Sequence, residues 1–369
     1  MSALHVLIAT DSFKGSASAA EVVAALAEGW RQGRPQDLIR TLPLADGGEG
    51  TMDVVAWARP EARRIAAEVS GPDGLPVSAA WLSLPGGGAL VELAAASGLP
   101  LLRTPAPMTA STVGVGQLVA AALDAGATSI DIGLGGSAST DGGTGALSAL
   151  GARFFDRAGN ALPPGGGDLQ QLARADLSGL RTPPPGGVRC FVDVTAPLLG
   201  PAGAGARFGP QKGATPPDVA RLERGLAQLA RLLGGRPDAA GAGAAGGTGY
   251  GLATAWGAQL VPGAAAVAAL TDLDAELSWA DLVITGEGRF DRTSMVGKVV
   301  GYLVERLAGK AADLILVAGQ IAEPPPRRVG HALSLADLGG IEQARAYPRH
   351  WLQQAGRLLA AEQSPQRAC

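Results

Sequence analysis

The chain has 369 residues, of which 47% are hydrophobic and 17% charged, and its net charge at neutral pH is −3. This composition is sufficient for a hydrophobic core and excludes global disorder. The absence of a run of Lys and Arg argues against a nucleic-acid partner, and two cysteines are too few to suggest a disulfide framework. The sequence shows no signal peptide and no apolar stretch long enough for a membrane span, so we expect a cytoplasmic protein without membrane contacts.

The first part of the chain alternates short apolar runs with helical patterns, which indicates α/β architecture. Residues 4–9 predict a buried strand, followed by a loop and a helix over 18–30. Ser18 and Glu21 have the spacing of a capping box at the start of that helix. A second strand over 38–42 leads into a loop rich in glycine and acids, and a helix to about residue 57.

The middle of the chain has a different pattern. We expect a hairpin turn within 69–77, strands over 79–84, 129–134 and 189–194, and helices over 112–125 and 219–233. Residues 239–248 are almost entirely Ala and Gly, which fits either a flexible linker or a close approach of the backbone to a ligand.

The order of strand, glycine-acid loop and helix returns near the end of the chain, with a strand over 281–285, a loop over 286–291, a helix over 297–307 and a strand over 314–318. The two chain ends therefore predict one parallel sheet. We expect an α/β protein with a discontinuous, Rossmann-like parallel-sheet domain, 1–69 and 269–369. A second α/β domain, 70–268, is inserted into it, and the active site lies in the cleft between them.

Lysine is scarce, with four residues against 26 arginines, and three of the four stand in glycine-rich motifs. These are Lys14, Lys212 and Lys298. A compact ammonium beside glycine backbone is a common way to hold phosphate, and guanidinium does not replace it. Chance proximity to the abundant glycines is the alternative.

A glycine-rich segment, 135–145, follows one predicted strand and precedes a predicted helix. Its backbone amides, with the helix dipole behind them, predict an anion site formed by Gly135, Gly136, Ser137, Gly142 and Gly143. The segment is neither a Walker A motif nor a dinucleotide fingerprint. A close-packed turn without a ligand is the alternative.

Carboxylates stand among glycines at the predicted strand ends, where open α/β sheets bind ligands. They are Asp46, Glu49, Glu287 and Asp291, and Asp193 ends a strand of the middle segment. Such groups could hold magnesium or accept a hydroxyl proton, or they could simply cap loops.

Five motifs together resemble the bacterial glycerate kinase family, in the order of that family and over nearly the whole chain. They are Asp11-Ser12-Phe13-Lys14-Gly15, Pro43–Thr51, Gly135-Gly136-Ser137-Ala138 with Asp141-Gly142-Gly143, Phe208–Gly213, and Thr285–Arg289 with Asp291 and Gly297-Lys298. The resemblance implies ATP-dependent phosphorylation of D-glycerate, most often giving 2-phosphoglycerate. A 3-kinase or a kinase of another small hydroxy acid are alternatives within this class. An oxidoreductase using nicotinamide and a non-catalytic ligand-binding regulator are the rivals outside it.

The motifs and the resemblance together assign expected roles to single residues. Lys14, Asp193 and Lys212 are expected to be catalytic, with Asp193 as the base near the acceptor hydroxyl. ATP is expected at Gly135, Gly136, Ser137, Gly142, Gly143, Gly286 and Lys298, substrate at Ser12, Asp46 and Arg207, and Mg²⁺ at Asp46, Glu287 and Asp291. We expect D-glycerate and ATP as the only partners, and a monomer or homodimer.

Overall fold

The computed structural model describes residues 3–363, which form two compact units. The first unit contains the chain up to Asp46, Asp53–Ala58 and the chain from Ala264 on, and the second contains Gly47–Met52 and Arg59–Gly263. This division differs from the expected domain boundaries at residues 47–52, 59–69 and 264–268. The strand over 63–70 pairs along its whole length with the next strand of the second unit, which explains why that stretch lies there.

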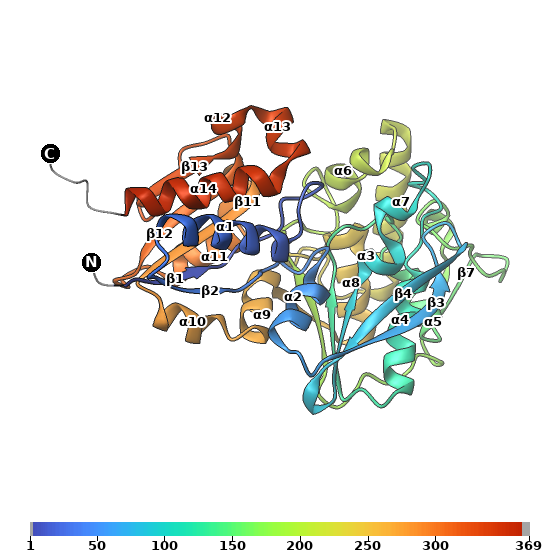
Figure 1. The fold of residues 1–369 in the computed structure, drawn as a ribbon. Coiled ribbons are helices and arrows are strands. Elements are labelled where there is room, and N and C mark those ends of the chain that lie inside the picture. Colours follow the sequence, from blue (N-terminus) through green and yellow to red (C-terminus); the bar gives the residue numbers. More distant parts are fainter. Residues whose placement is uncertain (1–2, 364–369) are drawn as a thin grey trace, which may run out of the picture. The chain divides into compact units, whose positions relative to one another are not determined.

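The first unit is built on a five-stranded sheet in the order β13-β12-β11-β1-β2, and all its strands run parallel (Figure 1). The strands are β1 (His5–Ile8), β2 (Leu38–Thr41), β11 (Leu282–Phe290), β12 (Asp313–Ile321) and β13 (His331–Ser334). Because β1 pairs with β11, the prediction that the two chain ends share one parallel sheet is confirmed.

Helices cover both faces of this sheet because its buried strands are apolar on both faces. Val6 and Ile8 join one core with α1 (Ala19–Gly33) and α14 (Pro348–Glu362), whereas Leu7 joins a second core with α10 (Leu273–Trp279) and α11 (Val299–Arg306). Ser18 and Glu21 form the predicted capping box. The remaining helices of this unit are most of α2 (Thr51–Ala58), α9 (Gly263–Leu270), α12 (Leu335–Gly339), α13 (Ile341–Ala346) and the 3-10 turn η5 (Arg292–Met295).

The prediction of a loop over 286–291 is wrong, because β11 continues through that segment to Phe290. Glu287 and Arg289 pair with Ala318 and Gln320 of β12. A Cβ atom on Gly286 would lie 2.1 Å from the carbonyl oxygen of Val317, so glycine lets the two strands approach here. The acid-glycine motif is therefore held on a sheet strand.

The second unit has a six-stranded mixed sheet in the order β10-β9-β6-β5-β4-β3, together with the small hairpin β7-β8. Strands β3, β4 and β5 are antiparallel neighbours and the others pair in parallel. The bounds are β3 (Arg63–Ser70), β4 (Pro76–Ser83), β5 (Gly88–Glu92), β6 (Ser129–Gly133), β7 (Arg153–Phe155), β8 (Arg174–Asp176), β9 (Val188–Val192) and β10 (Gln259–Pro262). The predicted hairpin is confirmed by β3 and β4.

The helices of the second unit pack around a single large core. They are α3 (Leu93–Ser97), α4 (Val113–Asp124), α5 (Thr144–Ala149), α6 (Ala204–Phe208), α7 (Pro216–Leu233) and α8 (Ala244–Trp256), with 3-10 turns η1 (Pro85–Gly87), η2 (Leu99–Leu101), η3 (Leu169–Gln171) and η4 (Pro210–Lys212). None of the helices within residues 3–363 is long and apolar enough to span a bilayer.

The Ala-Gly segment over 239–248 is packed rather than a free linker. Ala245, Gly246 and Gly247 have left-handed backbone angles at the start of α8. A Cβ atom on Gly246 would lie 2.1 Å from the carbonyl oxygen of Ser139. The backbone of this segment therefore approaches another loop of the protein closely, whereas the expected alternative was an approach to a ligand.

Candidate active site

In the first unit, the segments after β1 and β2 and the end of β11 meet at one edge of the parallel sheet. The amide of Asp11 donates to the carbonyl of Gly286 at 2.9 Å, and the amide of Leu44 donates to the carbonyl of Thr10, also at 2.9 Å. These bonds hold the Asp11–Gly15 motif beside the end of β11 that carries Glu287, and they hold the segment that leads to Asp46 beside the segment after β1. This is the edge at which open α/β sheets bind ligands.

Three acids at this edge, Asp11, Asp46 and Glu287, form a cluster, and burial raises the pKa of two of them, Asp11 and Glu287. Burial raises the pKa of Asp11 well above its ordinary value, and the charges of Asp46 and Glu287 add to the effect, against the Ser12 amide and Lys298, which lower it. The pKa of Glu287 is also raised by burial, while a hydrogen bond from Ser294 and the charge of Lys298 oppose the shift. The cluster thus carries more negative charge than its lysine compensates.

Glu287 is the most buried member of this cluster, with 6% of its surface exposed. Its Oε2 atom lies 3.7 Å from the Lys298 ammonium, whereas its Oε1 atom is buried without a hydrogen-bond partner. A buried carboxylate oxygen without a partner is costly unless a cation or donor fills the place. The donor set therefore fits a hard cation such as Mg²⁺, which prefers oxygen ligands.

The geometry of the acids does not make a metal site from protein groups alone. The described residues hold no set of three or more His, Cys, Asp or Glu side chains arranged as metal ligands. Mg²⁺ usually needs only one or two carboxylates, with water and phosphate oxygens completing its coordination. The cluster is compatible with that arrangement.

Asp291 has a local structural task. Its carboxylate accepts hydrogen bonds from the amide of Thr293 at 2.9 Å and from its hydroxyl at 2.7 Å, which caps the turn η5. It also lies 3.5 Å from the guanidinium of Arg289. The hydrogen bonds from Thr293 lower the pKa of Asp291, so it differs from the buried acids of the cluster.

The Ser12–Lys14 motif forms a tight turn directly after β1. Phe13 is buried and closes the turn, because its amide donates to the carbonyl of Ala17 at 2.8 Å. Ser12 is half-buried and its amide donates to the Asp11 carboxylate, while Lys14 is exposed. The turn leaves the Lys14 ammonium accessible to an anion. Asp11 was not among the expected site residues, although its place in the same motif was a usable signal.

In the second unit, the segments after β5, β6 and β9 also lie at a shared sheet edge, because β6 has β5 and β9 as parallel neighbours. Glu92 ends β5, the segment that starts at Gly135 follows β6, and Asp193 follows β9 and is half-buried. Glu92, which sequence reasoning missed, accepts hydrogen bonds from the amides of Gly50 and Met52. It thereby holds the Gly-Gly-Glu-Gly motif in place within this unit.

Most of the glycine-loop amides that were expected to hold an anion already donate to protein groups. Gly142 donates to the carbonyl of Gly246 at 3.0 Å, and Gly143 donates to the carboxylate of Asp141 at 3.0 Å. Gly135 makes a longer bond, 3.4 Å, to the carbonyl of Gly47. The carboxylate of Asp141 also accepts from the amide and hydroxyl of Thr112, so an internal anion fills this part of the loop.

The helix behind this loop is short, since α5 has six residues. Its dipole therefore contributes less to anion binding than expected. The part of the loop that begins at Gly136 and Ser137 carries a different pattern: the Ser137 hydroxyl bonds to Ser139, and Ala138 donates to the carbonyl of Ser97 at 2.9 Å.

Lys212 lies inside the protein, with 2% of its surface exposed. Its ammonium donates to the carbonyl of Ser139. Burial lowers the pKa of Lys212 to about 8, and the nearby charge of Asp141 opposes the shift. The ammonium thus fastens the glycine loop from within, which is a positioning role. Arg207, by contrast, lies on α6 with its guanidinium 5.3 Å from the ring centre of Phe208.

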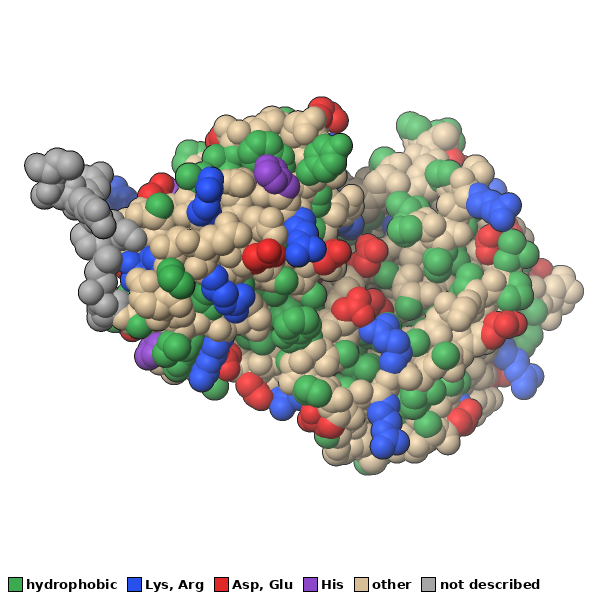
Figure 2. Space-filling model, viewed as in Figure 1, with side chains coloured by type: hydrophobic (Ala, Val, Ile, Leu, Met, Phe, Trp, Pro, Cys, Tyr) green, Lys and Arg blue, Asp and Glu red, His purple; other side chains and the backbone are tan. Residues whose placement is uncertain are grey.

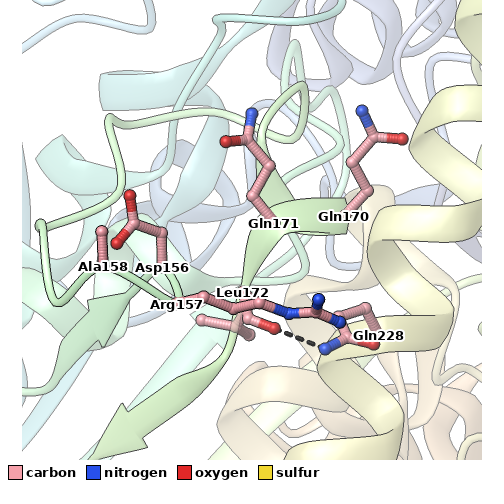
Figure 3. A pocket seen from close by; sticks show the side chains of 7 residues that line it. All are labelled: Asp156, Arg157, Ala158, Gln170, Gln171, Leu172 and Gln228. Carbon is pink, nitrogen blue, oxygen red and sulfur yellow. Dashed lines mark hydrogen bonds between the residues drawn. The ribbon is translucent and has the colours of Figure 1, made fainter.

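An open pocket of about 420 Å³ lies elsewhere in the second unit, near β8 and α7 (Figure 3). Asp156, Arg157, Ala158, Gln170, Gln171, Leu172 and Gln228 line it. None of these is an expected site residue, and the side-chain amide of Gln228 donates a hydrogen bond to the carbonyl of Leu172. The pocket therefore shares no lining residue with the expected site.

Charged side chains are interspersed over the molecular surface that Figure 2 shows, with acidic and basic groups in both units. No extended basic area interrupts this mixture on the face drawn, which agrees with the net charge of −3. Nucleic-acid binding has no support on that face.

Comparison with known proteins agrees with the motifs. Residues 6–363 match the glycerate kinase family. The chain is 42% identical over 329 residues to the glycerate kinase of Bacillus subtilis (strain 168), covering 86% of each chain, and 42% identical over 305 residues to the glycerate 2-kinase of Escherichia coli (strain K12), covering 80% of each. A solved crystal structure from Salmonella typhimurium LT2, described as a glycerate kinase 2, matches with a TM-score of 0.82 at 38% identity and covers 98% of both chains. The chain therefore belongs to the glycerate kinase family.

Proposed function

We propose that this enzyme transfers the γ-phosphoryl group of ATP to the 2-hydroxyl of D-glycerate and releases ADP and 2-phosphoglycerate. Membership of the kinase family decides against the oxidoreductase and regulator alternatives. The relative from Escherichia coli is a glycerate 2-kinase, which favours the 2-hydroxyl over the 3-hydroxyl. Since the reaction consumes ATP, we propose that it takes place in the cytoplasm.

The acid cluster of the first unit is the single observation that carries the proposal. Phosphoryl transfer depends on neutralising phosphate charge and on positioning, and little covalent chemistry is left to the protein. Asp46 and Glu287 would hold Mg²⁺, with Asp11 as a further acid beside them, and the metal would supply charge neutralisation at the phosphates. Lys298 lies beside Glu287 and would face the same phosphates. We give Asp291 a lesser part, because its carboxylate caps η5.

The remaining groups supply anion contacts and proton transfer in this proposal. Lys14 and Ser12, on the turn after β1, bind a phosphate or the glycerate carboxylate, and Arg207 binds the substrate. Asp193 accepts the proton of the glycerate hydroxyl. The oxygen of that hydroxyl forms a bond to the γ-phosphorus while the bond between the γ-phosphorus and the bridging oxygen breaks, and this oxygen leaves with ADP. Within the glycine loop, the preferred phosphate contacts are Gly135, Gly136 and Ser137. Gly286 contributes to the site because it permits the close approach of β11 to β12.

We assign a supporting role to Gly142 and Gly143 of the glycine loop and to Lys212 of η4, which donates to this loop. Their donors are engaged with Gly246, Asp141 and Ser139, which fixes the loop conformation before any ligand arrives. A preorganised loop needs no reorganisation during reaction, and this lowers the barrier to phosphoryl transfer.

An assay of ADP formation tests the proposal and distinguishes its parts. We expect ADP only when ATP, Mg²⁺ and D-glycerate are all present, and no activity with excess chelator until Mg²⁺ is restored. Coupling to enolase alone detects 2-phosphoglycerate directly, whereas 3-phosphoglycerate gives a signal only after a mutase is added. No D-glycerate-dependent ADP formation would contradict the kinase proposal, and a requirement for mutase would move the product to the 3-position.

A further inference from the structure

The backbone of the first unit stays extended beyond the end of β1. The amides of Ala9 and Asp11 both donate to carbonyls of β11, while the carbonyl of Thr10 between them accepts from the amide of Leu44 on the other side. Side chains of extended backbone alternate between the two faces of a sheet. Asp11 therefore shares a face with Leu7 and Ala9, which belong to the core under α10 and α11, and Thr10 lies on the opposite face.

Thr285 of β11 lies on the same face as Asp11. Val283, two residues earlier, belongs to the core that contains Leu7, and Glu287 follows two residues later on the same unbroken strand. Residues two apart on a strand point to one face. Val283, Thr285 and Glu287 thus form one row, and the electrostatic interaction between Asp11 and Glu287 agrees with this placement.

The hydroxyl of Thr285 is fully buried and has no hydrogen-bond partner among the described residues. Two of its neighbours on this face are apolar, Val283 in its own strand and Leu316 directly opposite on β12. The next side chain of its row is that of Glu287, whose Oε1 atom is also buried without a partner. Two unpartnered polar groups therefore stand in sequence at the end of β11.

Unpartnered buried polar groups are costly, so such a pair indicates a place that a ligand or water fills. A hydroxyl both donates and accepts hydrogen bonds, whereas a carboxylate oxygen accepts them. Mg²⁺ usually keeps several of its waters, and these can donate to both kinds of oxygen. The row from Thr285 to Glu287 therefore has the donor and acceptor character that a hydrated Mg²⁺ requires.

We propose that Thr285 is a further positioning residue of the acid cluster, whose hydroxyl binds a water of the hydrated Mg²⁺ held by Asp46 and Glu287. The inference rests on the proposed function, which gives the cluster its metal. Thr285 acts through water and is not a direct ligand. Removing a group that supports metal binding in this way typically costs about 10- to 100-fold in metal affinity.

A buried water that has no connection with the metal is the alternative partner of the Thr285 hydroxyl. Under that alternative, loss of the hydroxyl would change the stability of the chain and leave its response to Mg²⁺ as it is. The two cases therefore differ in a metal titration, and enzyme activity is not needed to separate them.

The experiment follows thermal melting of the full chain with ATP, without D-glycerate, while Mg²⁺ is raised. ATP itself binds Mg²⁺, so its concentration is the same for every variant. Thr285→Val should melt at a higher temperature than the natural chain in chelator, because an unpaired buried hydroxyl is lost. The Mg²⁺ concentration that gives half of the melting shift should rise about 10- to 100-fold. Thr285→Ser keeps the hydroxyl and should restore the natural Mg²⁺ response.

Thr10→Val is the matched control. The hydroxyl of Thr10 is likewise fully buried without a partner among the described residues, but it lies on the opposite face. Thr10→Val should also melt at a higher temperature in chelator, and its response to Mg²⁺ should equal that of the natural chain. Thr285→Ala allows the same comparison if Thr285→Val does not fold.

Three results overturn the proposal: a natural chain whose melting does not respond to Mg²⁺, a folded Thr285→Val with an unchanged Mg²⁺ response, or an equal change in Thr10→Val. ADP formation with D-glycerate, measured on the same preparations, tests the proposed function separately. If the natural chain responds to Mg²⁺ but forms no ADP, the kinase proposal fails, and the titrations still decide the role of Thr285.

Discussion

The ammonium nitrogen of Lys298 lies 3.7 Å from Oε2 of Glu287, whereas the other carboxylate oxygen, Oε1, is buried without a hydrogen-bond partner. The lysine thus neutralises one side of a buried acid and leaves the other side for a cation or donor. Lys298 directly precedes α11, so the start of that helix places it. This relationship connects the last motif of the sequence to the acid cluster of the first unit.

Replacing Lys298 with Met should raise the pKa of Glu287 further, because the charge that opposes its burial is lost. We expect kcat/KM for ATP to fall about 10- to 100-fold, as for other residues that support a metal ligand, with partial recovery at high Mg²⁺. Steady-state kinetics over a range of Mg²⁺ concentrations measure this. Lys310→Met, at an exposed lysine of the same unit, is the matched control and should behave as the natural enzyme.

Asp11→Asn should stabilise the metal-free protein while removing activity. The native carboxyl holds its proton to higher pH than the unfolded one, so the free energy of unfolding falls as pH rises above the ordinary pKa of 3.8. Asparagine removes this penalty and keeps an oxygen for the Ser12 amide. Melting temperatures at pH 7 in chelator should rise for Asp11→Asn but not for the exposed Asp313→Asn. An unchanged or lower melting temperature contradicts the assignment of Asp11 to a repulsive cluster.

Lys212 should give stability a distinctive pH dependence. Its native pKa of about 8 lies below its ordinary value of 10.5, so the unfolded chain binds more protons between these two values. The stability of the natural chain relative to Lys212→Met should therefore rise between pH 8 and 10.5, by up to about 3 kcal/mol at about 1.4 kcal/mol per pKa unit. Urea unfolding at several pH values measures the difference. Lys310→Met should show no such trend.

Lys14→Arg should keep the fold and lose activity. Lys14 is exposed at the end of the turn that Phe13 anchors, so the substitution disturbs no core contact. The larger, planar guanidinium does not replace a point charge at a phosphate or carboxylate. We expect kcat/KM to fall at least about tenfold, equivalent to about 1.4 kcal/mol. Near-normal turnover in folded Lys14→Arg would falsify this role, and Lys310→Arg serves as the control.

Asp193→Asn separates a base from a structural cap. A base contributes about 10²–10⁴-fold, so turnover should fall by that order with little change in nucleotide affinity or melting temperature. If Asp193 instead only caps the segment after β9, we expect Asp193→Asn to lower the free energy of unfolding by about 0.5–2 kcal/mol and to cause a modest loss of activity. Turnover and melting temperature measured on the same preparation decide between the two.

Much of the fold followed from local pattern. The apolar run before Asp11, the capping box at Ser18 and the helical spacing in the 219–233 segment each reflect interactions between near neighbours, and the structure contains all three elements. The glycine motifs likewise marked the segments that follow strands at the sheet edges. Local patterns of this kind are visible in a sequence because their periods match helix and strand geometry.

Tertiary structure decided the rest, since burial and long-range contacts have no local signature. The continuation of β11 through Glu287 depends on β12, about 30 residues later in the chain. Lys14 and Lys212 both stand in glycine motifs, yet one is exposed and the other is enclosed against the carbonyl of Ser139. A sequence states which residues carry charge, but the environment that sets their proton affinity and their access to ligands forms only when distant segments pack together.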